Sequence, residues 1–311
     1  MSDWQVPVRA IADGIRRRVL EHILAHDGGY MSQACSSAEL FAMLYGHVLR
    51  LAPSEAPLEP RPFLGVPGAG RPFTSGGEYH GPHGPDLDRF IFSPAHYALV
   101  LYAALIEVGR LGEHGLDRFN EDGSTVEMIG AEHSPGVETT TGSLAQALSQ
   151  AGGIALARKR RGDTGRVWVL MSDGEFQEGQ TWEAIDALAR FGLDNVRVIV
   201  DANGQQCDGV LEVPGTQSSL GERIRAFGAS ADEVDGHDLD ALQHAMCRPS
   251  DRPHVVVALT DPVHGLPLLG ERAPGLHYLR FTSAGEKERY RAAYAAMTLA
   301  PAGASSERTV G

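Results

Sequence analysis

The chain has 311 residues, of which 42% are hydrophobic and 22% are charged, a composition typical of a soluble globular protein with a sizeable core. Its net charge of −13, from 40 acidic and 27 basic residues, argues against a nucleic-acid partner. The three cysteines at positions 35, 207 and 247 are too few and too scattered for a disulfide framework or a zinc site.

The first residues lack the apolar core of a signal peptide, and no segment has the length and apolarity of a membrane span. We therefore expect no membrane partner and a reducing, cytoplasmic location. Two basic clusters, Arg16–Arg18 and Arg158–Arg161, lie in segments with a helical pattern. We expect both clusters to form solvated faces.

Helical periodicity marks the first part of the chain and predicts a helix over residues 7–25. A second helix is predicted to begin near Ser36 and Ser37, which Glu39 follows closely. Residues 52–86 are rich in proline and glycine and predict a long irregular insertion of functional or mobile character. Helical patterns return over residues 94–108 and 144–160.

From residue 166 onward, short apolar runs alternate with helical stretches. Strands are predicted over 166–171, 196–200 and 254–259, and helices over 180–191 and 239–246. This alternation favours an α/β fold, with a doubly wound, mainly parallel sheet and helices on both faces. We expect residues 1–299 to form a single domain with the insertion at 52–86, and residues 300–311 to be a disordered tail.

Two polar residues follow two of the predicted strands. Asp173 and Asn203 lie thirty residues apart, which is about the length of one βαβ unit. If the strands are neighbours, both side-chain oxygens approach one point at the carboxyl edge of the sheet, where ligands bind. Such oxygens suit Mg²⁺ or Ca²⁺, and Gly174 would let a diphosphate approach the backbone. Turn formation alone also explains these residue types at strand ends.

Asp173 and Asn203 lie in the segments DGEFQEGQTWEA and LDNVRVIVDANGQQCDG. These segments resemble the diphosphate-binding, N-terminal half of transketolase, a thiamine diphosphate enzyme. A looser resemblance runs through DRFIFSPAHYALVLYAAL, PGVETTTGSLAQALSQAGGIALA and EVDGHDLDAL. The resemblance implies the fold of a thiamine diphosphate-binding domain, with thiamine diphosphate and Mg²⁺ (or Ca²⁺) as cofactors.

The resemblance also implies roles for individual residues. The metal ligands would be Asp173, Asn203 and the backbone carbonyl of Gln205. The cofactor-binding residues would be His96, Gly142, Leu144, Asp173, Gly174, Glu175, Asn203 and His277. The catalytic residues would be His26, His96, His277 and Glu178. The histidines would exchange hydrogen bonds and protons, with a pKa near neutrality, and Glu178 and Glu183 would link paired active sites at a subunit interface.

The chain departs from the family pattern at several positions. The family's Gly-Asp-Gly is Ser172-Asp173-Gly174, its Leu-Gly-Gln-Gly is Leu144–Ala147, and its Gly-His is Ala95-His96. A Gly-to-Ala change stiffens the backbone without harm where the angles allow it. The family's Gly-His-Pro element is shortened to IGAEHSPG, in which His133 is a candidate replacement for the missing histidine. With the insertion, these changes indicate a substrate other than the sugar phosphates of central metabolism.

The family requires a second α/β domain for the aminopyrimidine ring, and we expect this chain to be too short to contain it. The resemblance therefore implies a partner chain with the pyrimidine-binding and C-terminal domains, in an α₂β₂ assembly. The leading hypothesis is the diphosphate-binding subunit of a two-component, transketolase-like enzyme that transfers a two-carbon ketol unit from a ketose donor to an acceptor.

Two alternatives stay open. One is a subunit of a specialised-pathway thiamine enzyme that passes the unit to a lipoyl or carrier-protein thiol or to a non-sugar aldehyde. The other is a non-catalytic, cofactor-binding scaffold. A nucleotide-binding protein of another family is disfavoured, because neither G-x-G-x-x-G after a strand nor G-x-x-x-x-G-K-[ST] occurs in the sequence.

Overall fold

The computed structural model describes residues 3–207, 209–211 and 219–299. The predicted tail at 300–311 lies outside these residues. Among the described helices, none is long and apolar enough to cross a membrane.

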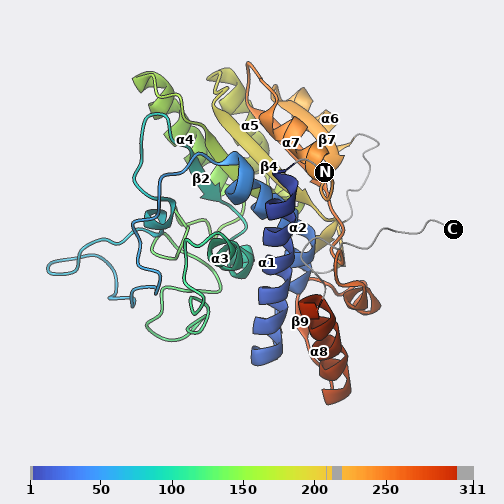
Figure 1. The fold of residues 1–311 in the computed structure, drawn as a ribbon. Helices are drawn as coiled ribbons and strands as arrows, with labels where there is room; N and C mark the ends of the chain where they lie inside the picture. The colour runs from blue at the N-terminus through green and yellow to red at the C-terminus, as the bar shows by residue number, and fades with distance from the viewer. Residues whose placement is uncertain (1–2, 208, 212–218, 300–311) are drawn as a thin grey trace.

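A five-stranded parallel sheet forms the centre of the described chain (Figure 1). Its strand order is β2-β3-β4-β8-β7, and every neighbouring pair is parallel. The strands are β2 (Arg89–Phe92), β3 (Val167–Ser172), β4 (Val196–Ala202), β7 (Ser230–Asp235) and β8 (His254–Leu259). This architecture confirms the predicted α/β fold class.

Helices cover both faces of the sheet, so the central strands are apolar on both sides. Within β4, Ile199 faces one core while Val198 and Val200 face the other, which is the two-residue alternation of a strand. One face packs against α1 (Gln5–His26), α2 (Met31–Met43), α3 (Ala98–Glu107) and α7 (Leu239–Cys247). The other face packs against α4 (Gln146–Arg161), α5 (Gly179–Arg190) and α6 (Leu220–Ala226).

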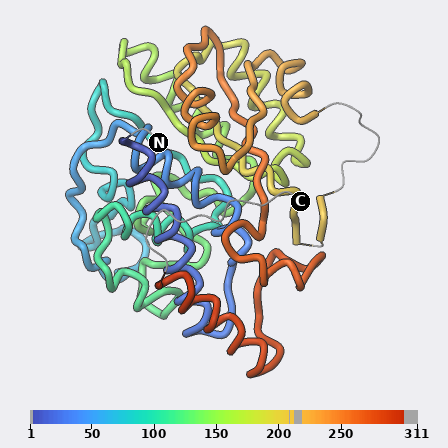
Figure 2. The backbone as a smooth tube through the Cα atoms, turned by 45° about the vertical axis from the view of Figure 1, so that its right-hand side comes forward, coloured from blue at the N-terminus to red at the C-terminus, as the bar shows by residue number. Residues whose placement is uncertain are grey.

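Smaller elements complete the structure. The last described helix, α8 (Ala284–Leu299), packs against α1, as the crossing of the red and blue segments in Figure 2 shows. Two short antiparallel pairs are β1 (Gly28–Gly29) with β9 (Leu279–Arg280), and β5 (Gln205–Gln206) with β6 (Gly209–Val210). Short 3-10 or π turns are η1 (Leu44–Val48), η2 (Gly76–His80), η3 (Ala95–Tyr97), η4 (Asp173–Gln177) and η5 (Pro267–Arg272).

Most predicted elements lie within a few residues of their predicted bounds, but the predicted start of the second helix is wrong. Helix α2 begins at Met31, so Ser36 and Ser37 lie inside it. Ser37 Oγ donates to the carbonyl of Gln33 at 2.6 Å, one turn back in the helix, instead of capping its start. The sequence patterns also miss β2, which has four residues, and the acidic edge strand β7, which reads SADEVD.

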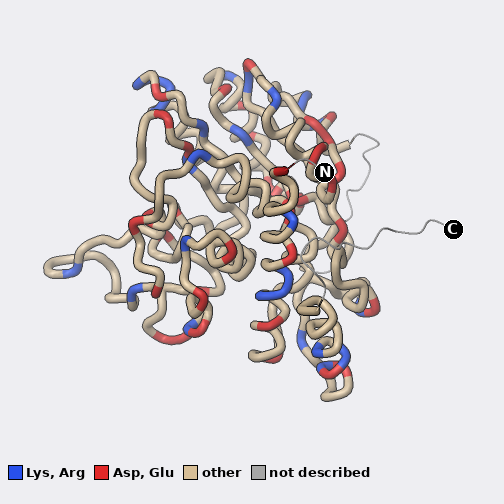
Figure 3. The backbone as a smooth tube through the Cα atoms, viewed as in Figure 1, with Lys and Arg blue, Asp and Glu red and all other residues tan. Residues whose placement is uncertain are grey.

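The expectation of fully solvated basic faces is also wrong, because Arg16 and Arg158 are buried. Arg16 pairs with Glu39 of α2. Arg158 Nη2 donates to three backbone carbonyls at the end of the 52–86 insertion, including that of Leu87 at 2.7 Å. The other Lys and Arg positions are scattered among acidic ones in the view of Figure 3.

The 52–86 insertion is irregular, as predicted, apart from η2 and an isolated bridge between Gly68 and Arg71. Its base is fixed by Glu138, whose side chain is buried. The Glu138 carboxylate accepts hydrogen bonds from His80 Nδ1 at 2.9 Å, from the Phe90 N–H at 3.1 Å and from Arg89 Nε. Several apolar side chains of the insertion are exposed, namely those of Leu58, Phe63, Leu64, Val66 and Phe73.

Candidate active site

The tips of β3 and β4 bring Asp173 and Asn203 together. The two strands are adjacent and parallel, with Ser172 paired with Asp201, so both end at one edge of the sheet. Asp173 Oδ2 accepts a hydrogen bond at 2.8 Å from the N–H of Gly204, the residue after Asn203. Asn203 Oδ1 accepts one at 2.9 Å from the N–H of Gln205, in β5. The three predicted metal ligands therefore lie on one turn and the strand tip beside it.

The charge of this edge fits a cation. Asp173 and Asp201 are both buried, and in the described part of the chain neither carboxylate pairs with a lysine or arginine. Burial raises the pKa of Asp173 to about 7, and the nearby Asp201 carboxylate adds to this increase. Two buried carboxylates without a positive partner are costly, and a hard divalent cation would supply the missing charge.

Gly174 borders open space beside these ligands. A Cβ built at this position would meet no atom within 4 Å, so a phosphate group has room to approach the backbone here. This observation fits the diphosphate expected from the sequence.

His96 and His277 also meet near this edge. His96 lies in η3, directly after β2, and His277 precedes β9, yet their ring centroids are 5.3 Å apart. The centroid of the Tyr30 ring lies 5.6 Å from that of His96 and 5.5 Å from that of His277. Gln33 Nε2 donates a hydrogen bond to the backbone carbonyl of His277 at 3.1 Å. Sequence reasoning misses Tyr30 and Gln33, because no motif marks them and their partners lie far along the chain.

The expected pKa near neutrality is wrong for His96. Burial, followed by the proximity of His277, lowers the pKa of His96 to about 4, and burial also lowers the pKa of His277. His96 is therefore neutral at pH 7, and its imidazole can both donate and accept a hydrogen bond. An incoming diphosphate would favour its charged form.

Within the described residues, the hydrogen bond and the ring stacking of His26 are with His22 and not with the other two histidines, His96 and His277. His26 is the last residue of α1; its Nδ1 lies 2.9 Å from the carbonyl of His22, and its ring stacks on the His22 ring. His133, the candidate replacement histidine, stacks on Phe63 and lies 3.1 Å from a carboxylate oxygen of Glu127. The roles expected for His26 and His133 stay predictions.

Glu175 is buried inside the protein rather than turned to a ligand. Its Oε2 accepts from the N–H of Ser172 at 2.8 Å, and its Oε1 accepts from the N–H of Ala145 at 2.9 Å and from Ser93 Oγ. These bonds hold the loop before α4 against the tips of β2 and β3. The loop residues Gly142 and Leu144 are exposed, as are Glu178 and Glu183 at the start of α5.

Known proteins that resemble this chain identify its family. Residues 78–268, more than half of the chain, match the family described as transketolase, thiamine diphosphate binding domain. The chain belongs to the transketolase family. The sequence-based assignment to this family is therefore confirmed.

Two relatives show how much of the chain the transketolase resemblance covers. The chain is 35% identical over 271 residues to the transketolase family protein y4mO of Sinorhizobium fredii, with 86% of this chain and 88% of that protein covered. It is 33% identical over 197 residues to an apulose-4-phosphate transketolase subunit from Actinobacillus succinogenes, with 62% of this chain and 71% of that protein covered.

The fold is that of the solved transketolases. A transketolase from Pichia stipitis superposes with a TM-score of 0.69 at 21% identity, covering 94% of this chain and 44% of that chain. The chain also spans 39% of the mouse transketolase-like protein 2. It therefore corresponds to less than half the length of these two transketolase relatives.

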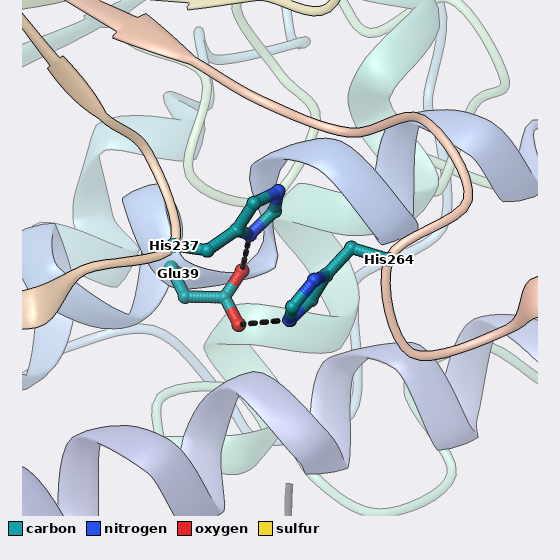
Figure 4. Close-up of side chains that lie close together, drawn as sticks. All are labelled: Glu39, His237 and His264. Carbon is teal, nitrogen blue, oxygen red and sulfur yellow. Dashed lines mark hydrogen bonds and ion pairs between the residues drawn. The ribbon is translucent and has the colours of Figure 1, made fainter. Parts of the chain in front are cut away.

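A second polar cluster contains Glu39, His237 and His264 (Figure 4). The distances between its ligand atoms would suit a metal ion, but Glu39 is already paired with Arg16. His237 uses both ring nitrogens: Nδ1 lies 3.0 Å from Glu39 Oε2, and Nε2 accepts from the N–H of Asp261 at 2.8 Å. A metal at Nδ1 would require a proton on Nε2, directly against that N–H. We interpret this cluster as a structural one, which joins α1 and α2 to the loops after β7 and β8.

Proposed function

We propose that this chain is the diphosphate-binding subunit of a two-component, thiamine diphosphate-dependent enzyme that transfers a two-carbon ketol unit from a ketose donor to an acceptor. The observation that carries the proposal is the meeting of Asp173 and Asn203 at one sheet edge, where the buried carboxylates of Asp173 and Asp201 have no cationic partner among the described residues. In this proposal Asp173, Asn203 and the Gln205 carbonyl hold Mg²⁺.

Thiamine diphosphate, when bound, supplies an electron sink for cleavage of the bond next to a carbonyl group. The residues of this chain would bind and orient it. His96 and His277, which are neutral at pH 7 before the cofactor binds, would donate hydrogen bonds to the diphosphate or to a substrate oxygen. Gly174 would leave room for the phosphates, and Glu175 would hold the 142–144 loop in place through Ala145.

The partner would carry the pyrimidine-binding and C-terminal domains, in an α₂β₂ assembly in the cytoplasm. Two facts support a separate partner chain. A relative bears the name of a transketolase subunit, and this chain spans 44% of a solved transketolase chain. We further propose that the chain up to residue 299 works as one domain. Its exposed Leu144, Glu178 and Glu183 would face the partner.

The proposal is tested by mixing this chain with its partner chain and measuring donor cleavage with thiamine diphosphate and Mg²⁺. We expect turnover only when both chains are present, and we expect chelation of Mg²⁺ to abolish it. Asp173→Ala should lower turnover and Mg²⁺ affinity by about 100-fold or more, since it removes a direct ligand. Asp235→Ala, at the tip of β7, is the matched control and should retain both.

Cofactor binding without donor cleavage by the reconstituted pair would contradict the enzymatic proposal and favour the scaffold alternative. A failure to bind thiamine diphosphate and Mg²⁺, with or without the partner, would contradict the cofactor assignment itself.

A further inference from the structure

A buried polar cluster lies directly beneath the proposed metal ligands. At its centre is Asp201, a fully buried residue of β4. Its Oδ2 accepts hydrogen bonds from Ser36 Oγ at 2.6 Å, from the Tyr97 hydroxyl at 2.9 Å and from Asn203 Nδ2 at 3.0 Å. Its Oδ1 accepts one from Thr260 Oγ1 at 2.5 Å. The three hydroxyl donors come from α2, from η3 and from the loop after β8.

This cluster determines which way the Asn203 amide points. Asn203 Nδ2 lies 3.0 Å from Asp201 Oδ2, 3.0 Å from the Tyr97 hydroxyl and 3.3 Å from Ser36 Oγ. In the reversed orientation, the amide oxygen would face the Asp201 carboxylate and the NH₂ group would face the N–H of Gln205. Both contacts would be repulsive in a buried site. Only the observed orientation therefore presents Oδ1 to the 203–205 turn, whose Gly204 N–H donates to Asp173.

We propose that Asp201, Tyr97 and Ser36 are positioning residues that fix Asn203 Oδ1 as a ligand of the divalent cation. The proposal rests on the proposed function, because it presupposes a cation at Asp173 and Asn203. Groups that hydrogen-bond to a metal ligand set its orientation, and their loss typically costs about 10–100-fold in metal affinity. The Tyr97 hydroxyl has a direct part in this, since it donates to Asp201 and accepts from Asn203.

Tyr97→Phe is the sharpest test, because it removes one hydroxyl and keeps the ring. The matched control is Tyr102→Phe: Tyr102 is also buried, and its hydroxyl donates at 2.9 Å to the carbonyl of Glu127, outside this cluster. Mn²⁺ binding to the full chain in the presence of thiamine diphosphate is measured by electron paramagnetic resonance, and thermal stability by calorimetry. We expect Tyr97→Phe and Ser36→Ala to weaken Mn²⁺ binding by about 10-fold, and Tyr102→Phe by less than about 2-fold.

A double-mutant cycle shows whether the hydroxyl acts through Asn203. In an Asn203→Ala background, Tyr97→Phe should cause no further loss of Mn²⁺ affinity, because the side chain that it positions is gone. Equal Mn²⁺ affinities in wild type and Tyr97→Phe, with stability lowered as in Tyr102→Phe, would overturn the proposal and leave the cluster a purely structural role. Wild-type protein that binds neither Mn²⁺ nor thiamine diphosphate, alone and when mixed with its partner chain, would instead overturn the proposed function, and the positioning role with it.

Discussion

At the scale of single residues, Ala145 departs from the family pattern at a position where its backbone conformation is unfavourable. Its φ of 70° lies in the left-handed region, which disfavours any residue with a Cβ by roughly 1–2 kcal/mol. The resemblance places a glycine of the family here, and the condition under which alanine would be harmless, an allowed backbone angle, is not met at this position. The conformation persists because the Ala145 N–H donates to the buried Glu175, which ties the loop to the strand tips.

We predict that Ala145→Gly is better tolerated than Ala147→Gly, by about 1–2 kcal/mol in the free energy of unfolding. Both alanines are fully buried, so both variants lose a buried methyl group. Only the first relieves a left-handed alanine, because Ala147 lies within α4. Urea unfolding of the two variants measures the difference, and equal losses would contradict the argument.

At the scale of elements, helix α2 serves several parts of the molecule. Gln33 contacts His277, Ser36 contacts Asp201, and Glu39 contacts Arg16. Helical periodicity predicts that this helix exists, but it does not reveal its start at Met31. Strand-end reasoning predicts that Asp173 and Asn203 meet. It does not find Gln33 or Asp201, because their partners lie 244 and 165 residues away in the chain.

The 52–86 insertion has a fixed base and a free tip. Glu138→Gln should lower the free energy of unfolding by about 3–5 kcal/mol, because it leaves Arg89 without its buried counter-charge and removes the carboxylate that His80 contacts. Replacing residues 64–71 with two glycines should change it by less than about 1 kcal/mol, since the hydrogen bonds between Gly68 and Arg71 lie within this segment. Calorimetry on the two variants checks both, and a large loss from the shortened tip would contradict this division.

At the scale of the whole molecule, buried ionisable groups set the response to acid. Burial lowers the pKa of His22 and of His264 to about 4, so the fold favours their neutral forms. Burial alone would raise the pKa of Glu39 and of Glu138. This effect of burial is outweighed at Glu39 by Arg16 and His237, and at Glu138 by His80 and Arg89. The pKa of each glutamate is lowered to about 2. The fold therefore favours the charged forms of these two glutamates.

We predict that these histidines and glutamates reduce stability in two stages as the pH falls. Asp173 acts in the opposite direction, because its pKa is raised to about 7 and its protonation favours the folded state between pH 7 and about pH 4. The histidine contribution is fully present above pH 6.5 and declines towards pH 4, as the unfolded chain gains protons first. The glutamate contribution is present above about pH 4.5 and declines towards pH 2. Urea midpoints at pH 7, 5 and 3 follow both stages. Glu39→Gln should be less stable at pH 7 and show a smaller decline below pH 4.5; an unchanged slope there would contradict the assignment.

The connection of β2 to β3 has a consequence for how the chain reaches its folded state. Arg89 pairs with Val167, so this parallel pairing closes a loop of 78 residues, and closing such distant contacts slows folding. Until β2 arrives, the edge of β3 offers unpaired backbone groups to any neighbouring strand. Production of the protein in cells should therefore depend on temperature and on synthesis rate, with slow synthesis giving the larger share of folded chains.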